Sequence, residues 1–110
     1  MGKESTGQLF SETDNVEKVF NFWASKQKRP QVCKLTEERR GLISRRMSDG
    51  YTAEELILVI KYYYESNSDD ARWMRGHNPS HRKYLGLDNL FRKKKLGDRL
   101  ELAKNWEEDL

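Results

Sequence analysis

The stretch DGYTAEELILVIKYYYESNS, residues 49–68, decides the fold of this chain. Thr52 and Glu55 stand three residues apart in the pattern of a capping box, and Tyr51 with Leu56 matches the hydrophobic staple that accompanies such a box. A single helical stripe of apolar side chains then follows, made of Leu56, Ile57, Ile60, Tyr63 and Tyr64. This pattern predicts a helix from Thr52 onward, with the stripe turned toward the core.

Leu58 and Tyr62 lie one turn apart on the opposite side of the same predicted helix. A helix that is apolar on two faces lies centrally in its domain, or it offers one face to a partner. Burial within the domain is the first interpretation of Leu58 and Tyr62. The second makes them candidate partner-binding residues.

Two further helices are predicted before this stretch. The first begins at Thr13 or Asp14, and its core face consists of Val16, Val19, Phe20 and Trp23. Residues 25–35 then form a basic connector that is broken by Pro30. Residues 1–12 are polar and have no period, so we expect a disordered lead followed by a single domain at residues 13–110.

The second upstream helix begins at Thr36 and ends before Gly50, which suits a left-handed C-cap. Its apolar stripe contains Leu42, Ile43 and Met47. Arg39 and Arg46 fall in the same angular range, so we expect them to border the core. Arg45 points the other way and is available to solvent or a ligand.

The part after residue 68 is predicted to be helical but interrupted. A short turn reaches Met74, and Gly76, Pro79 and Gly86 prevent long regular structure. A single helical turn at residues 87–91 and a last helix at about 96–108 complete the chain. No alternating strand pattern is present, so the predicted fold is all-α, a compact bundle of four to five short helices with a long basic connector.

Charge is distributed in blocks along the 110 residues. The net charge is only +3, but residues 26–46 and 72–99 together hold 17 of the 21 lysines and arginines. Residues 47–71 carry one cation and six anions. Blocks of one sign favour a directed electrostatic field over a uniformly solvated surface.

Several chemical classes find no support in the sequence. Cys33 is the single cysteine, and no apolar run approaches the ~20 residues that cross a bilayer, so we expect a cytoplasmic protein. His77 and His81 are four apart, but Pro79 between them argues against the helix that would put both on one metal. No phosphate loop or nucleophile elbow is present. We expect no enzyme activity, metal or cofactor.

Nucleic-acid binding and protein binding remain as the two main alternatives. Cations neutralise phosphates, and aromatic side chains beside them stack on unpaired bases. The candidate nucleic-acid-binding residues are Lys26, Lys28, Arg29, Arg45, Arg72, Trp73, Arg75, Arg82, Lys83, Arg92, Lys93, Lys94 and Lys95. Tyr84 is a second aromatic candidate, although Tyr84 and Trp73 would equally suit a core position.

An ordered set of motifs resembles the C-terminal domain of phage replication proteins, the replisome organisers and O-type initiators that are loosely similar to DnaD-like primosome proteins. The set begins with LISRRMSDGYTAEELILVI at residues 42–60 and continues with Trp73, Tyr84-Leu85 and Leu90-Phe91. Upstream, residues 19–40 resemble the first helix, the proline-containing connector and the basic second helix of that family. The chain departs from the family at Gly86-Leu87, where Arg-Pro is common, and in its short N-terminal part.

The resemblance implies a role in phage or prophage DNA replication, in the cytoplasm of a bacterial host cell. Family members bind single- or double-stranded DNA and engage the host helicase or its loader. The expected function is therefore a non-catalytic DNA-binding accessory domain. The alternative is an adaptor for the helicase, its loader or another host protein, through Leu58 and Tyr62 or the acidic residues 107–109. A phage regulator that inhibits a host protein is a third, weaker interpretation.

Overall fold

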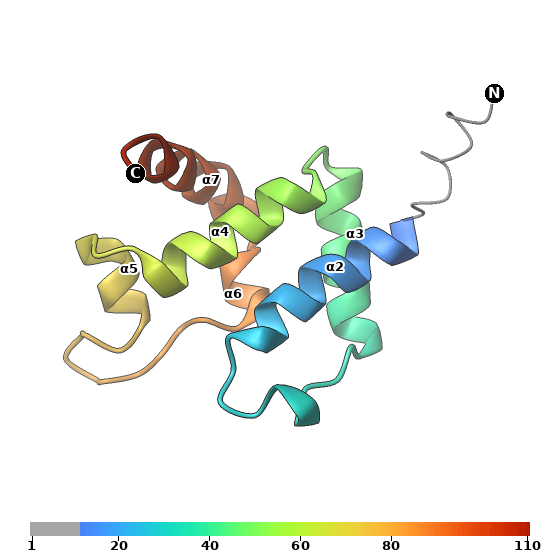
Figure 1. The fold of residues 1–110 in the computed structure, drawn as a ribbon, viewed down its shortest axis with the longest axis horizontal. Helices are drawn as coiled ribbons and strands as arrows, with labels where there is room; N and C mark the ends of the chain where they lie inside the picture. The colour runs from blue at the N-terminus through green and yellow to red at the C-terminus, as the bar shows by residue number, and fades with distance from the viewer. Residues whose placement is uncertain (1–11) are drawn as a thin grey trace.

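The computed structural model describes residues 12–110, and in that part of the chain every regular element is helical (Figure 1). The elements in order are α2 (Glu12–Ser25), η1 (Pro30–Val32), α3 (Glu37–Ser48), α4 (Ala53–Glu65), α5 (Asp69–Met74), α6 (Leu87–Leu90) and α7 (Lys93–Glu108). The all-α prediction is confirmed. The described residues contain more α-helices than the expected four to five, because the short segments at 69–74 and 87–90 both form α-helices. The predicted disordered lead, except for Glu12 in α2, lies outside the described residues.

Helix α4 is the centre of the domain and packs against α2, α5 and α7. Its capping box forms as predicted, since the Glu55 amide donates to Thr52 Oγ1 at 3.1 Å and the Thr52 amide donates to Glu55 Oε1 at 3.0 Å. The buried side chains of this helix are Ala53, Leu56, Val59, Ile60, Tyr62 and Tyr63. Burial therefore extends round more of the helix than the predicted stripe.

Helix α7 covers the second apolar face of α4. Tyr62 is only 3% exposed, and its ring meets the Trp106 ring edge-on at 5.7 Å between centroids. Its hydroxyl lies 2.8 Å from the hydroxyl of Ser68. For Tyr62, burial within the domain is therefore confirmed and the partner-binding alternative is wrong, because α7 packs against it. Leu58 is only half-buried.

Helices α2 and α3 pack together beside α4. The predicted core face of α2 is buried from Val16 to Trp23. On α3, Arg46 is buried, whereas Arg39 places its guanidinium 4.8 Å from the centre of the Trp23 ring. Arg45 is exposed. These positions confirm the predicted orientation of the three arginines.

The C-terminal helix begins earlier than predicted. It starts at Lys93 instead of about residue 96, so Lys93, Lys94 and Lys95 form its first turn. Leu87, Leu90 and Phe91 dock into the core just before it, as predicted. Within residues 12–110, no helix combines the length and the apolar character that crossing a membrane requires.

Candidate nucleic-acid interface

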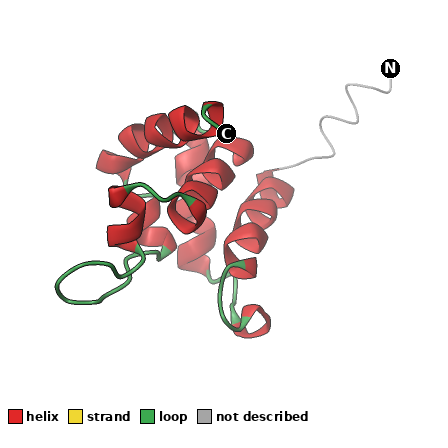
Figure 2. Cartoon of the chain, turned by 60° about the vertical axis from the view of Figure 1, so that its left-hand side comes forward, coloured by secondary structure: helices red, strands yellow, loops and turns green. Residues whose placement is uncertain are grey.

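The connectors between α2 and α3 and between α5 and α6 lie at the same end of the molecule (Figures 1 and 2). They line a hollow of about 400 Å³ between them. Its lining residues are Trp23, Lys26, Gln27, Lys28, Tyr64, Lys83, Leu85 and Gly86. The fold thus brings lysines of the two basic segments, more than 50 residues apart in sequence, to one site, which we call the inter-connector hollow.

Trp23 links the second connector to α2, the helix that the first connector follows. It is the last buried aromatic residue of the α2 core face, and its indole Nε1 donates to the backbone oxygen of Leu85 at 2.9 Å. The first connector is stiffened by the single 3-10 turn that Pro30 begins. A core side chain therefore fixes the position of the second connector relative to the first.

Asn78 organises the second connector. Its side chain is buried, and Nδ2 donates to the backbone oxygens of Trp73 at 2.7 Å and Arg82 at 2.8 Å. Its Oδ1 accepts from both the amide and the hydroxyl of Ser80. Sequence reasoning missed Asn78, although asparagine before proline is a known turn signal. These bonds give the connector a defined shape.

Backbone geometry at the tip of this connector is unusual. His81 has φ of +57° and Gly76 has φ of +111°, which places both in the left-handed region. His77 and His81 line a second hollow of about 540 Å³ together with Arg75. In residues 12–110, no group of three or more histidine, cysteine or acidic side chains is arranged to hold a metal ion.

Trp73 lies on the surface. Its side chain is 46% exposed, and its ring stacks on that of Tyr84 with centroids 5.1 Å apart and 15° between the planes. On α5 the neighbouring Ala71 and Met74 take the buried positions instead. Trp73 was predicted to face either the core or a ligand, and its exposed ring is available to a ligand. The half-buried Tyr84 supports this ring by stacking on it.

Ten of the predicted cationic residues are exposed and make no ion pair within residues 12–110. They are Lys28, Arg29, Arg45, Arg72, Arg82, Lys83, Arg92, Lys93, Lys94 and Lys95. Lys26 and Arg75 differ from them. Lys26 pairs with Glu65 at 3.0 Å, and Arg75 donates to the backbone oxygen of Tyr63 at the end of α4 at 3.0 Å. These two side chains serve the fold at least in part.

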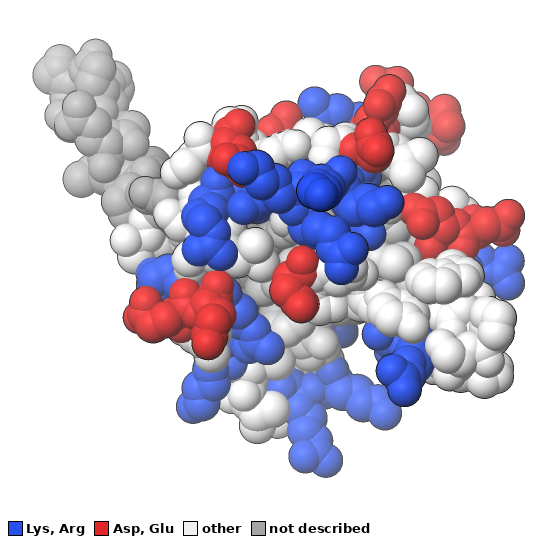
Figure 3. All heavy atoms as spheres, turned by 180° about the vertical axis from the view of Figure 1, so that it is seen from behind, with Lys and Arg blue, Asp and Glu red and all other residues white. Residues whose placement is uncertain are grey.

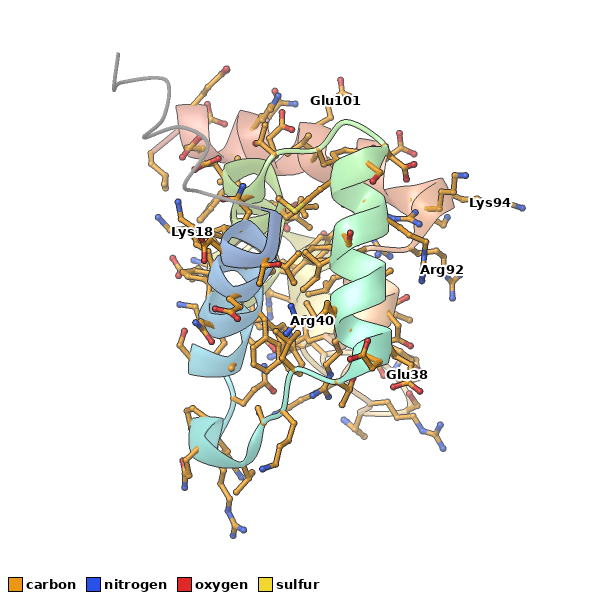
Figure 4. All side chains as sticks on the ribbon, turned by 90° about the vertical axis from the view of Figure 1, so that its right-hand side faces the viewer. Lys18, Glu38, Arg40, Arg92, Lys94 and Glu101 are labelled. Atoms are coloured by element: carbon orange, nitrogen blue, oxygen red, sulfur yellow. The ribbon has the colours of Figure 1, made fainter. Side chains whose placement is uncertain are left out.

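The start of α7 is strongly positive. Arg92 occupies the N-cap without a side-chain cap bond, and the first turn contains three lysines and no acid. A helix N-terminus already carries partial positive charge, so this arrangement opposes helix stability and strengthens the local field. Arg92 and Lys94 project on the side of the molecule shown in Figure 3, where basic side chains gather in a broad patch, whereas Lys18 lies on the opposite side (Figures 3 and 4).

Among residues 12–110, four ionisable groups have a pKa that their surroundings clearly shift. Burial raises the pKa of Tyr64, and burial together with a hydrogen bond to Asp70 raises the pKa of Tyr63. Both phenols are protonated at neutral pH even at their ordinary pKa, and these shifts move their ionisation further from it. A hydrogen bond from Lys18 lowers the pKa of Glu54, and the Thr52 amide lowers the pKa of Glu55.

Comparison of the chain with known protein families, with curated proteins and with solved structures found no match. The resemblance to phage replication proteins therefore stays a prediction that rests on the motifs alone.

Proposed function

We propose that this domain binds nucleic acid without catalysing a reaction, through the unpaired cations of the two connectors and of the α7 start. The observation that carries the proposal is the convergence of Lys28 and Lys83 on one hollow. Binding to phosphate costs these cations little, because within residues 12–110 no ion pair with a carboxylate has to be broken first. Neutralising phosphates with them releases counterions.

The exposed Trp73 supports a preference for unpaired strands. One face of its ring rests on Tyr84, which leaves its exposed part available to a base. Stacking on an aromatic ring contributes ~1–3 kcal/mol per base and tolerates any sequence. We therefore propose single-stranded DNA as the preferred ligand. A role in phage or prophage DNA replication rests on the motif resemblance only.

The test is the affinity of the protein for a labelled single-stranded oligonucleotide and its duplex, measured by fluorescence anisotropy over a series of salt concentrations. The expected result is tight binding at low salt that weakens as salt rises, with the single strand bound more tightly than the duplex. Weak binding at low salt, or binding that is indifferent to salt, would rule the proposal out.

A protein adaptor is the second candidate, and one observation favours it. A hollow of about 630 Å³ lies between the first connector, α3 and the start of α6, and its lining includes Val32 and Leu42. Val32 is 61% exposed and adds apolar surface at this hollow. A Val32→Glu variant that keeps its oligonucleotide affinity but loses the capture of a replicative helicase or its loader would favour the adaptor function.

A further inference from the structure

The inter-connector hollow has features that phosphate binding alone does not require. Its volume of about 400 Å³ falls within the ~300–1,000 Å³ that is typical of small-molecule sites. The buried part of its lining includes Trp23, and Tyr64 and Leu85 are half-buried. Lys28 and Lys83 are exposed and stand at its rim. The lining therefore combines aromatic side chains with polar groups and two exposed lysines, which correspond to the base and the phosphates of a nucleotide.

Gln27 is fixed inside this lining. Its Nε2 donates to the backbone oxygen of Trp23 at 2.9 Å and to the hydroxyl oxygen of Tyr64 at 2.8 Å. Both amide hydrogens are therefore used. The carbonyl oxygen Oε1 has no donor within residues 12–110, so it remains as an acceptor held at a fixed place.

Tyr64 supplies the complementary group. Its hydroxyl oxygen accepts the bond from Gln27, so its own proton remains to be donated. A phenol keeps its proton at neutral pH, and burial raises the pKa of this one further. The hollow thus presents an acceptor and a donor next to each other, on two side chains that are bonded to one another.

Neighbouring donor and acceptor groups are the common property of nucleobase edges. An exocyclic amino group beside a ring nitrogen, or a ring N–H beside a carbonyl, pairs with an acceptor and a donor in this order. We propose that the inter-connector hollow holds one unpaired nucleobase between Trp23, Tyr64 and Leu85, with Lys28 and Lys83 at the adjoining phosphates. For a base within a strand, this inference rests on the proposed nucleic-acid function.

The experiment compares two single-stranded oligonucleotides with equal numbers of phosphates, one intact and one abasic throughout. Tyr64→Phe removes the donor and keeps the ring, and Tyr51→Phe is the matched control outside the hollow. We expect Tyr64→Phe to weaken binding of the intact strand by about threefold to tenfold and to leave the abasic strand unchanged. Gln27→Met serves as the second variant if Tyr64→Phe lowers the melting temperature.

The outcomes separate this inference from the proposed function. Equal losses for the intact and abasic strands, or no loss for either with both variants, would overturn the base site while leaving phosphate binding in place. If neither strand binds wild-type protein at low salt, nucleic-acid binding itself fails. The base could also come from a free mononucleotide instead of a strand. Titration with adenosine and cytidine monophosphates tests this, with ribose 5-phosphate as the control that lacks a base. Binding of the monophosphates that Tyr64→Phe weakens would support a mononucleotide site.

Discussion

Two sides of this domain carry lysines in opposite situations. Beside α4, Lys18 pairs with Glu54 at 3.1 Å and Lys104 pairs with Glu55 at 3.2 Å. At the connector end, Lys28 and Lys83 have no carboxylate partner within residues 12–110. The residue type is the same on both sides, so the difference lies in the ion pairs. A paired lysine contacts a carboxylate of the domain, whereas an unpaired lysine is available to an anionic ligand.

Two aromatic pairs show the same contrast. Tyr62 and Trp106 meet edge-on between α4 and α7, and Tyr62 is fully enclosed there. Trp73 and Tyr84 stack face to face, and nearly half of Trp73 is exposed. The first pair closes the core, whereas the second adds apolar surface on α5 and on the connector after it, which also carries the unpaired Arg82 and Lys83.

The largest expected effect concerns the enclosed pair. Replacing Trp106 by alanine removes the cover of Tyr62, and we expect the free energy of unfolding to fall by about 2 kcal/mol, because Trp106 is half-buried. Urea denaturation followed by circular dichroism measures this loss. Oligonucleotide affinity of the folded variant should not change, and a change would place Trp106 in the interface.

The next effect concerns the exposed pair. Trp73→Ala should weaken binding of single-stranded DNA by about tenfold, since one stacked base is lost, and should reduce stability by less than about 1 kcal/mol. Anisotropy titration measures the change in affinity, and urea denaturation measures the change in stability. A large stability loss with unchanged affinity would make Trp73 a packing residue and remove the contrast between the two pairs.

A smaller effect is expected on the paired side as pH falls. Glu55 has a folded pKa below its ordinary value of 4.5, so its ionised form stabilises the fold above that value, and this contribution is lost as pH falls through the folded pKa. Gln can keep the capping bond without the charge. The stability advantage of wild type over Glu55→Gln should therefore shrink between about pH 6 and pH 3, as urea denaturation would show. An advantage that stays constant with pH would contradict this assignment.

The smallest effect is expected from the paired lysines themselves. Lys18 and Lys104 are both more than half exposed, and exposed ion pairs contribute little. The double variant Lys18→Ala, Lys104→Ala should lose less than about 1 kcal/mol of stability in thermal or urea unfolding. A larger loss would mean that pairing on this side is a main source of stability.

Local signals explain which elements could be predicted from the sequence. Helix α4 could be predicted from the capping box of Thr52 and Glu55, and α2 from the spacing of Val16, Val19 and Phe20. Each of these signals involves residues of a single helix, so no tertiary information was needed. The α7 start could not be predicted correctly, because three lysines at a helix N-terminus run against the dipole preference.

Less of the candidate site could be predicted from the sequence, because the site is formed by contacts between residues far apart in the chain. The basic segments were recognised, but their meeting at the inter-connector hollow depends on the bond from Trp23 to Leu85. The exposure of Trp73 depends on Ala71 and Met74 facing the core in a six-residue helix. The covering of Tyr62 depends on a helix more than 30 residues downstream.

The salt dependence of matched double variants tests the central claim most directly. Lys28→Ala, Lys83→Ala and Lys18→Ala, Lys104→Ala remove the same charge from the unpaired and the paired side. Each phosphate contact to a single strand contributes about 0.7 to the slope of log affinity against log salt. We predict that the first variant flattens this slope by about 1.4 and that the second leaves it unchanged. Equal slopes for the two variants would contradict the claim that the unpaired lysines form the nucleic-acid interface.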